Sequence, residues 1–441
     1  FTVTPYDVSG TVDYDRLLER FGADRLTDEQ VARFPDHPML RRGIYYAGRS
    51  VDRYLDAAEA GETHSIVTGV GPSGPLHLGH ALGFYLAKAL QDATGAEVLV
   101  PLSDDEKYYA KDLRYGEIST YRDENLRDLL AVGFDPEKTT IVVDTEDADV
   151  VYPVASAFAR HLTQSTVDAT YGEPDNVGLS FYPAVQAAHL LLPQLIRGEH
   201  PTLVPVAVDQ DPHVRVCRDV AAKERFPVSK PGALLGRFLP TLDGPGKMSS
   251  SDDVPAIDLT DDPDDVRDVI RRHAFTGGRA SVAEHREHGG DPAIDVPFQY
   301  LRFFFERDDD ELARIEAAYR EGELLSGELK ELAADRIGEF LAGHQRRRAA
   351  LGDLESELEP LPAAVQLAKR PGRAGRCPWR RAERLRGHGR AIGMLHEHEP
   401  VRGIKEQHLG RHAGRRGGPA VVLLHPAIDE LLRARTGNTQ N

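Results

Sequence analysis

Residues 64–80, HSIVTGVGPSGPLHLGH, combine residue types that suit the binding of a phosphate group. Ile66–Val70 is an apolar run with the length of a buried strand, and a glycine- and proline-rich turn follows it. An apolar pattern at helical spacing comes next, so His77, Gly79 and His80 fall on the first turn of a predicted helix. Unpaired N–H groups and the positive end of the helix dipole attract anions there, and Gly79 lets a base or a phosphate approach the backbone.

A second stretch, 247–251, reads Lys-Met-Ser-Ser-Ser between glycine- and aspartate-rich neighbours. A lysine among hydroxyl groups is by itself typical of a solvated surface loop, and a Gly-Pro turn before a helix is by itself common. The two stretches in this order and at this separation are the stronger signal. Together they resemble the HIGH and KMSKS signatures of the class I aminoacyl-tRNA synthetases.

The elements that must position these residues follow the pattern of a doubly wound, parallel α/β domain of Rossmann type. Apolar runs that predict buried strands alternate with helical patterns, and polar residues such as SDDE and DQDP follow the strands. The carboxyl ends of parallel strands are where ligands bind in such sheets. Besides 66–70, strands are predicted at 96–102, 139–144 and 203–208, helices at 14–34, 151–170 and 180–196, and a basic turn at 40–50.

Composition and charge divide the 441 residues into four parts. We expect an N-terminal extension (1–60), a Rossmann-type catalytic domain (61–257), an all-helical domain (258–360) and a basic tail (361–441). The tail carries a net charge of +10 and the rest −27, and only 10 of the 54 basic residues are lysines. Such an acidic, lysine-poor body repels nucleic acid in dilute salt and suits a salt-rich cytoplasm, which leads to the hypothesis of a halophilic protein.

Other classes of protein are disfavoured by what the sequence lacks. It has two cysteines, far apart, and so neither a disulfide framework nor a cysteine metal site. No apolar run has the length of a membrane span, and the first residues do not read as a signal segment. We therefore expect a cytoplasmic protein without a membrane partner.

The resemblance sharpens over about residues 40–360, which are similar to the tryptophanyl-tRNA synthetases of the archaeal and eukaryotic type. It implies ATP and Mg²⁺ as cofactors, tryptophan and tRNA(Trp) as partners, an anticodon-binding role for the helical domain, and a homodimer. The motifs that carry it are SDDEKYYAKDL (103–113), SFYPAVQAAH (180–189), VAVDQDPHVRVCRDVA (206–221), HAFTGGR (273–279) and LSGELKELA (325–333).

The same resemblance assigns site residues by position. It implies that Lys247, His77 and His80 form the catalytic set, with Lys247 on the departing pyrophosphate, and no protein ligand set for a metal. Ser250 stands where the family pattern has a second lysine, so Mg²⁺ is expected to supply more of the charge neutralisation. The expected ATP contacts are Gly71, Ser73, His77, Gly79, His80, Lys247, Met248, Ser249 and Ser250, and the expected amino-acid contacts are Glu106, Gln186 and Gln210.

Two positions depart from the family pattern. Val67 stands where a tyrosine is expected and Pro101 where a glutamine is expected, and those two side chains would read the indole N–H. The first alternative is therefore a class I synthetase paralogue for another amino acid, such as tyrosine. The second is a catalytically silent, synthetase-like binding protein, against which intact Lys247, His77 and His80 argue.

The tail over 361–441 supports two interpretations. A basic extension could hold tRNA phosphates. A GC-rich gene read out of frame would also give this mixture of Arg, Gly, Ala, Pro and His. On either interpretation we expect the tail to be largely disordered.

Overall fold

The computed structural model describes the chain except residues 1, 4–7, 10–12, 224–225, 245–254 and 353–441. Lys247, Met248, Ser249, Ser250 and the basic tail thus lie outside the described residues. In the described part, a mixed sheet in the order β3-β4-β9-β8-β5-β6-β7 forms the centre of the molecule. Its strands are β3 (Asp24–Arg25), β4 (Tyr45–Arg49), β5 (Ser65–Val67), β6 (Glu97–Leu102), β7 (Thr139–Val143), β8 (Thr202–Ala207) and β9 (Gly232–Gly236).

The five strands from β9 to β7 are parallel, whereas β4 and β3 join one edge antiparallel. The chain runs from β5 outward through β6 to β7, returns across the sheet to β8, and then continues to β9. The direction of winding therefore reverses between β5 and β8. In a doubly wound fold this is the point at which a crevice opens beyond the carboxyl ends of the strands. The predicted fold class, a parallel Rossmann-type domain followed by helices, is confirmed.

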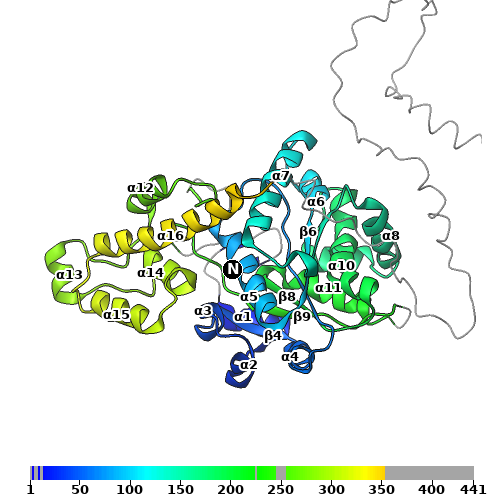
Figure 1. Cartoon of the computed structure of the whole chain (residues 1–441), viewed down its shortest axis with the longest axis horizontal. Helices are drawn as coiled ribbons and strands as arrows, with labels where there is room; N and C mark the ends of the chain where they lie inside the picture. The colour runs from blue at the N-terminus through cyan, green and yellow to red at the C-terminus, as the bar shows by residue number, and fades with distance from the viewer. Residues whose placement is uncertain (1, 4–7, 10–12, 224–225, 245–254, 353–441) are drawn as a thin grey trace, which may run out of the picture. The chain divides into compact units, whose positions relative to one another are not determined.

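Helices cover both faces of the sheet (Figure 1). On one face α4, α5 and α7 share a core with the helical region, and on the other α1, α8, α10 and α11 enclose a second core. The helices are α1 (Tyr14–Phe21), α2 (Asp28–Arg33), α3 (Pro38–Arg41), α4 (Val51–Ala60), α5 (Leu78–Thr94), α6 (Asp104–Ala110), α7 (Tyr115–Val132), α8 (Ala148–Ala159), α9 (Gln164–Tyr171), α10 (Val177–Arg197), α11 (Asp211–Ala221), α12 (Pro263–His273), α13 (Val282–His288), α14 (Val296–Tyr300), α15 (Asp309–Arg320) and α16 (Ser326–Ala349).

Short elements complete the described chain. The 3₁₀ turn η2 follows β8 directly and leads into α11. These elements are the antiparallel pair β1 (Thr2–Val3) and β2 (Val8–Ser9), the 3₁₀ turns η1 (Pro136–Lys138) and η2 (Val208–Gln210), and the π-helical turn η3 (Leu301–Phe305).

The N-terminal part differs from the sequence prediction. The basic turn expected at 40–50 is wrong, because Tyr45–Arg49 forms β4, which pairs with β9. The single helix expected at 14–34 is also wrong, since Gly22 ends α1 with a left-handed φ of 63° and β3 precedes α2. The first 60 residues therefore extend the catalytic sheet instead of only packing on it.

Two other predictions were wrong in detail. Strand β9 was missed, because its five residues, GALLG, are glycine-bounded and too short for a clear pattern. The helix expected at 151–170 is two helices, because Thr163 accepts the N–H of Thr166 and starts α9 as a new helix.

Pro101 in β6 explains why β5 is only three residues long, because it has no N–H to donate to the strand beside it. Past Val67, the N–H groups of Thr68 and Val70 still donate to Leu99 and Pro101 at 3.1 and 3.0 Å, and pairing resumes as a single bridge between Val70 and Leu102. The chains are close here, since a Cβ at Gly69 would lie 2.3 Å from the carbonyl oxygen of Pro101. The strand predicted through Val70 therefore runs three residues past the end of β5.

Polar contacts and a shared apolar core join the helical region to the sheet domain. Near α3, Arg41 and Arg42 both donate to Asp309, at 2.9 and 2.7 Å. Elsewhere α16 packs on α7, where buried His344 bonds Tyr85 of α5 at 2.9 Å. Arg41 and Arg42 are thus held by contacts within the protein.

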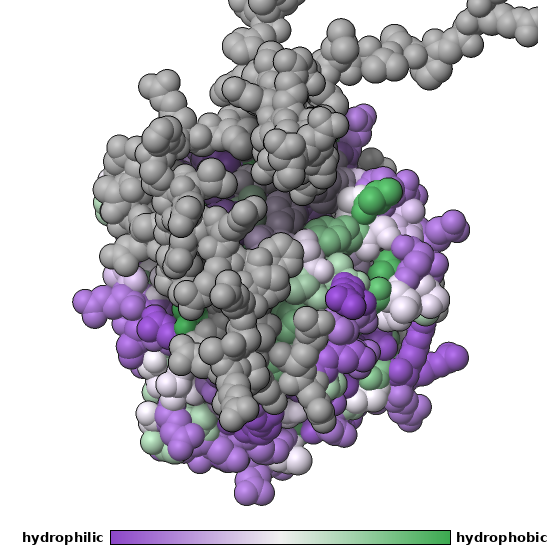
Figure 2. Space-filling view, turned by 90° about the vertical axis from the view of Figure 1, so that its right-hand side faces the viewer, coloured by the Kyte–Doolittle hydropathy of each residue, from purple (hydrophilic) through white to green (hydrophobic). Residues whose placement is uncertain are grey.

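Hydrophilic side chains predominate over the visible part of the face in Figure 2, with hydrophobic ones in scattered patches. Within the described residues, none of the helices has the length and apolar character needed to cross a membrane.

Arg49 and Asp211 form an ion pair that ties β4 to the start of α11. Arg49 donates to both carboxylate oxygens, at 2.7 and 2.8 Å, and Asp211 is fully buried. Arg49 also donates to the carbonyl oxygens of Phe21 and Gly22 at the end of α1. One guanidinium therefore holds α1 and β4 of the N-terminal part to α11.

Replacing Arg49 with alanine should lower the free energy of unfolding by about 3 kcal/mol, because it leaves a buried carboxylate with poorer compensation. Urea unfolding in concentrated KCl measures the change, since salt screens a buried pair little. Arg314→Ala is the matched control, because Arg314 pairs with Glu311 on the surface of α15, and it should cost under about 0.5 kcal/mol. Equal costs for the two variants would contradict the role given to Arg49.

Candidate active site

The first signature lies where the sequence placed it. His77 is the residue that precedes α5, and His80 lies on the first turn of the helix. Their rings stack at 3.7 Å between centroids and 23° between planes. Gly79, which has no side chain, lies between them. The start of α5 therefore places two imidazoles and a glycine next to the turn at 71–75.

Backbone hydrogen bonds bring the residues that follow the second signature against the first signature. Leu78 N–H donates to the Ile257 carbonyl at 2.9 Å, and Leu259 N–H donates to the Leu76 carbonyl at 2.8 Å. His77 and Asp258 are the bridge pair between these bonds. The chain that emerges from 245–254 is therefore fixed on the start of α5.

The glycine-rich turn is held from two sides. Asn125, fully buried on α7, donates to the carbonyl oxygen of Gly74 at 3.0 Å. On the other side, a Cβ at Gly71 would lie 2.1 Å from Cε of Lys107 and 2.7 Å from Oε2 of Glu106. The turn thus lies directly against the start of α6.

Acidic side chains follow β6 and fill the first turn of α6. Asp104, Asp105 and Glu106 are all buried, and Glu106 pairs with Lys107 at 2.7 Å. Asp104 accepts the N–H and the hydroxyl of Thr145 at 3.1 and 2.6 Å. The SDDE segment after β6, which the sequence predicted at the ligand-binding edge of the sheet, is therefore helical and places a cluster of acidic side chains in the interior.

Gln186 lies on the face of α10 that packs toward this cluster. Tyr182, one turn before it, donates its hydroxyl to Oε1 of Gln186 at 2.9 Å. His189, one turn after it, brings Nδ1 to 3.4 Å from the same oxygen. The other nitrogen of His189 lies 2.6 Å from Oδ1 of Asp144, which follows β7. Both His189 and Asp144 are fully buried.

Gln210 occupies the end of η2, directly after β8. Its Nε2 donates to Oδ2 of Asp209 at 3.0 Å. Three residues later His213, on α11, meets Tyr182 edge to face and bonds the hydroxyl of Tyr171 at 3.1 Å. Gln210 therefore lies on the β8 side of the crevice, whereas Glu106 lies on the β6 side.

Burial changes the proton affinity of this cluster. Desolvation, and then the charge of Asp144, raise the pKa of Asp105 to about 8. Desolvation likewise raises the pKa of Asp144 well above its ordinary value. Desolvation lowers the pKa of His189 to about 4, so its imidazole is neutral at neutral pH. The site thus holds neutral acids and a neutral base side by side.

The structure brings several predicted site residues to one edge of the sheet. Gly71, Ser73, His77, Gly79 and His80 form the turn and helix start after β5. The charge of Glu106 acts on both Tyr182 and His189, so Glu106 and Gln186 face one cluster. Gln210 lies across the β5–β8 reversal. Their ligand contacts stay predictions.

Sequence reasoning missed part of the cluster: Asp105, Asp144, Tyr152, Tyr182 and His189. A signal existed for four of them. Asp105 follows the predicted strand 96–102 and Asp144 ends the predicted strand 139–144, while Tyr182 and His189 stand four before and three after Gln186, on the same helix face. Tyr152 donates to Oδ2 of Asp105 at 3.0 Å.

The two departures from the family pattern lie next to this cluster. Val67 pairs with Leu99 of β6, and both are buried in the core that α10 and α11 cover. Pro101 is two residues beyond Leu99 and so points to the same face of the sheet. Neither side chain offers a hydrogen-bond acceptor there.

The described part of the chain offers no set of protein ligands for a divalent cation. The described residues contain no group of three or more His, Cys, Asp or Glu side chains suited to hold a metal ion. The acidic cluster beside Glu106 is instead occupied by hydrogen bonds from Thr145 and Tyr152.

Comparison with known proteins now decides the family. Residues 59–342 match the model of the class I tRNA synthetases (W and Y). The chain belongs to the class I tRNA synthetases. This synthetase is 69% identical to tryptophan–tRNA ligase 2 of Halobacterium salinarum over 358 residues, which cover 81% of the chain and 93% of that relative. The resemblance that the motifs indicated is therefore confirmed.

Solved structures agree with that assignment. The tryptophanyl-tRNA synthetase from Giardia lamblia is 35% identical, with a TM-score of 0.71 over 78% of this chain and 95% of that one. The enzyme from Encephalitozoon cuniculi bound to tryptophan is 31% identical, with a TM-score of 0.71 over 80% and 99%. The Halobacterium relative also fits the hypothesis, from the acidic and lysine-poor composition, of a halophilic protein.

Gly71→Ala should lower kcat/KM for ATP–pyrophosphate exchange roughly tenfold, because the new methyl group displaces Lys107 and Glu106. Stability should change little, since Lys107 is the flexible group that moves. Gly116→Ala on α7 is the matched control, because a Cβ there meets no atom within 4 Å. Unchanged exchange kinetics in the Gly71 variant would show that the turn does not position the α6 residues.

Proposed function

We propose that the crevice at the β5–β8 reversal is where this synthetase joins tryptophan to ATP. The chain is a tryptophan–tRNA ligase: it activates the amino acid as an adenylate and transfers it to tRNA(Trp). High identity over most of a curated ligase of this specificity carries the function. The assignment of particular residues to ATP, tryptophan and tRNA is our proposal.

On the ATP side, the start of α5 receives the nucleotide. The turn containing Gly71 and Ser73 and the first turn of the helix with His77, Gly79 and His80 offer N–H groups and imidazoles to phosphate oxygens. Asp258, four residues after 245–254, is paired with His77, which supports a role for Lys247, Met248, Ser249 and Ser250 at the same nucleotide.

The chemistry requires little covalent participation by the protein. A carboxylate oxygen of tryptophan attacks the α-phosphorus of ATP, the bond to the bridging oxygen breaks, and pyrophosphate leaves with the electron pair. His77, His80 and Lys247 stabilise the negative charge on the phosphate oxygens and the leaving group. Mg²⁺ supplies additional neutralisation when it is bound with ATP, and residues of this chain position the reacting groups.

On the amino-acid side, Glu106, Gln186 and Gln210 hold the polar end of tryptophan. Glu106 offers a carboxylate to the ammonium group, and its Lys107 partner keeps the local charge balanced. Gln186 offers an amide from α10, and Gln210 another from the β8 side of the crevice. The three groups approach from different elements, which would orient the carboxylate toward the nucleotide.

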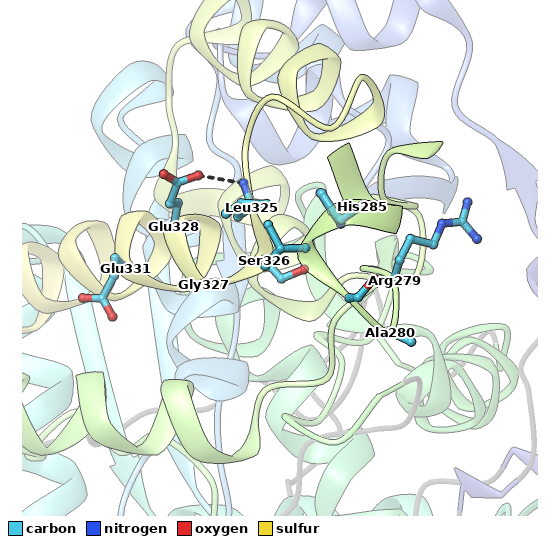
Figure 3. Close-up of a pocket in the computed structure, with 10 residues that line it drawn as sticks. Arg279, Ala280, His285, Leu325, Ser326, Gly327, Glu328 and Glu331 are labelled. Atoms are coloured by element: carbon cyan, nitrogen blue, oxygen red, sulfur yellow. Dashed lines mark hydrogen bonds between the residues drawn. The ribbon is translucent and has the colours of Figure 1, made fainter. Parts of the chain in front are cut away.

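The helical region (258–360) is proposed to bind the tRNA anticodon. A cavity of about 500 Å³ opens there, far from the acidic cluster, with Arg279 and Ser326 on its wall (Figure 3). Glu328 accepts a hydrogen bond from the N–H of Leu325 at 2.8 Å, and Glu331 pairs with Arg267 at 2.9 Å. With these acids partnered, an arginine and hydroxyl groups are suited to the edge of an unstacked base.

The remaining expectations also belong to this proposal. We place the enzyme in the cytoplasm as a homodimer without a membrane partner. The body's acidic surface would bind tRNA with least repulsion at high salt.

Lys247→Ala should reduce the single-turnover rate of adenylate formation by roughly 10²-fold, because the lysine meets charge that grows on the departing pyrophosphate. The ATP affinity should change less than the rate. Rapid-quench measurement of adenylate, with Lys230→Ala on the exposed surface as control, tests this. A collapse of ATP affinity with an unchanged rate would make Lys247 a ground-state contact.

Among the twenty amino acids, tryptophan should support ATP–pyrophosphate exchange at high KCl. Because Val67 and Pro101 offer no acceptor to the indole N–H, the double variant Val67→Tyr with Pro101→Gln should lower the KM for tryptophan roughly 5-fold or more. Val67→Phe with Pro101→Leu, which adds bulk without polar groups, is the control. Exchange with tyrosine and not tryptophan would support the paralogue, and exchange with none would leave the binding protein.

A further inference from the structure

One oxygen on α10 receives two contacts. Oε1 of Gln186 accepts the hydroxyl hydrogen of Tyr182 at 2.9 Å and faces Nδ1 of His189 at 3.4 Å. Tyr182 in turn has a hydrogen bond with Ser103, at the end of β6. The amide N–H groups of Gln186 are then the end of the side chain turned away from Tyr182 and His189.

The contacts of His189 fix where its single proton lies. A neutral imidazole donates from one nitrogen and accepts at the other. For Nδ1 to donate to Gln186, Nε2 must accept, and its neighbour at 2.6 Å is Oδ1 of Asp144. A carboxylate cannot donate, so Asp144 must carry a proton. The opposite arrangement would set two acceptors, Nδ1 and Oε1, against each other.

The surroundings of Asp144 favour the protonated form. Asp144 is fully buried, and desolvation raises its pKa well above the ordinary value of an aspartate. The pKa of Asp105, raised to about 8 by burial and by Asp144, and the pKa of His189, lowered to about 4 by burial, agree with neutral groups. The ionisable groups that act on this chain from neighbouring elements are Asp104, Glu106, Lys107, Tyr109, Arg122, Tyr152, Tyr182 and His213.

We infer that Asp144 and His189 are positioning residues that set which end of the Gln186 amide faces the substrate. Protonated Asp144 donates to His189, His189 donates to Oε1, and the amide N–H groups of Gln186 are turned toward the carboxylate of the amino acid. This inference rests on the proposed contact between Gln186 and tryptophan. It assigns Gln186 to the carboxylate and leaves the ammonium group to Glu106.

The arrangement has a consequence for pH. When the pair Asp105–Asp144 loses a proton, Asp144 becomes an acceptor, Nε2 of His189 donates to it, and Nδ1 becomes an acceptor as well. The Gln186 amide then turns its N–H groups inward and presents oxygen to the substrate carboxylate. Because burial raises the pKa of Asp144 well above its ordinary value, the proton is present at lower pH and lost as the pH rises, so the KM for tryptophan should rise toward alkaline pH.

Two substitutions of His189 test the inference in the full-length enzyme. His189→Asn keeps an N–H donor near the position of Nδ1, whereas His189→Leu fills the space without one. The leucine variant should raise the KM for tryptophan roughly 10-fold with kcat and the KM for ATP within about twofold of the native enzyme. The asparagine variant should stay within about threefold, and its KM should not follow the alkaline rise of the native enzyme.

Equal effects of the leucine and asparagine variants on the KM for tryptophan would overturn the inference. It would also be overturned if, between pH 6.5 and 8.5, the KM of the native enzyme did not rise more than the KM of the asparagine variant. If the leucine variant fails to fold, Tyr182→Phe tests the second donor to Oε1, and it should raise the KM for tryptophan while ATP binding is unchanged.

Gln186→Ala separates the two levels of the proposal. A raised KM for tryptophan in that variant, with no effect of either His189 variant, would retain the proposed site and reject the inference. An unchanged KM in Gln186→Ala would reject the contact itself, and the inference with it.

Discussion

The pairing of β5 between β6 and β8 is the constraint on which the rest of the structure depends. β5 has three residues and ends where Gly69 meets the backbone of Pro101, while its neighbours run on to Leu102 and Ala207. The central strand therefore stops before both of its neighbours. The turn after β5 then has space to carry His77 and His80 on a new helix, and α6 and η2 close the two sides.

The cost of this arrangement is a set of carboxyl groups removed from water. Asp104, Asp105, Glu106 and Asp144 gather at the ends of β6 and β7, and such burial is tolerated only with hydrogen bonds or neutralisation. Thr145, Tyr152 and Lys107 supply part of it, and proton uptake supplies the rest. In the proposed site, the polar end of the amino acid would therefore meet carboxyl groups that gain or lose protons more readily than they move.

The parallel part of the fold could be predicted because each of its predicted strands is a run of buried apolar residues. β4 and β9 could not, because LRRGIYYAGRS carries charged residues and glycines, GALLG is very short, and their pairing joins segments nearly 200 residues apart. Within the site, Glu106, Gln186 and Gln210 were predicted by resemblance. The link from Asp144 to His189 depends on a helix lying over a strand end, and no spacing in the sequence encodes it.

The attachment of the helical region has a mechanical meaning. Asp309 is held by two arginines near α3, His344 is held by Tyr85 of α5, and η3 and α16 lie in the same apolar core as α4, α5 and α7. A swing of the region that contains α12–α15 would separate these packed side chains and expose the core to water, at a cost in free energy that grows with the apolar area exposed. The helical region therefore stabilises the position of α5, the helix that follows His77 and carries His80 on its first turn.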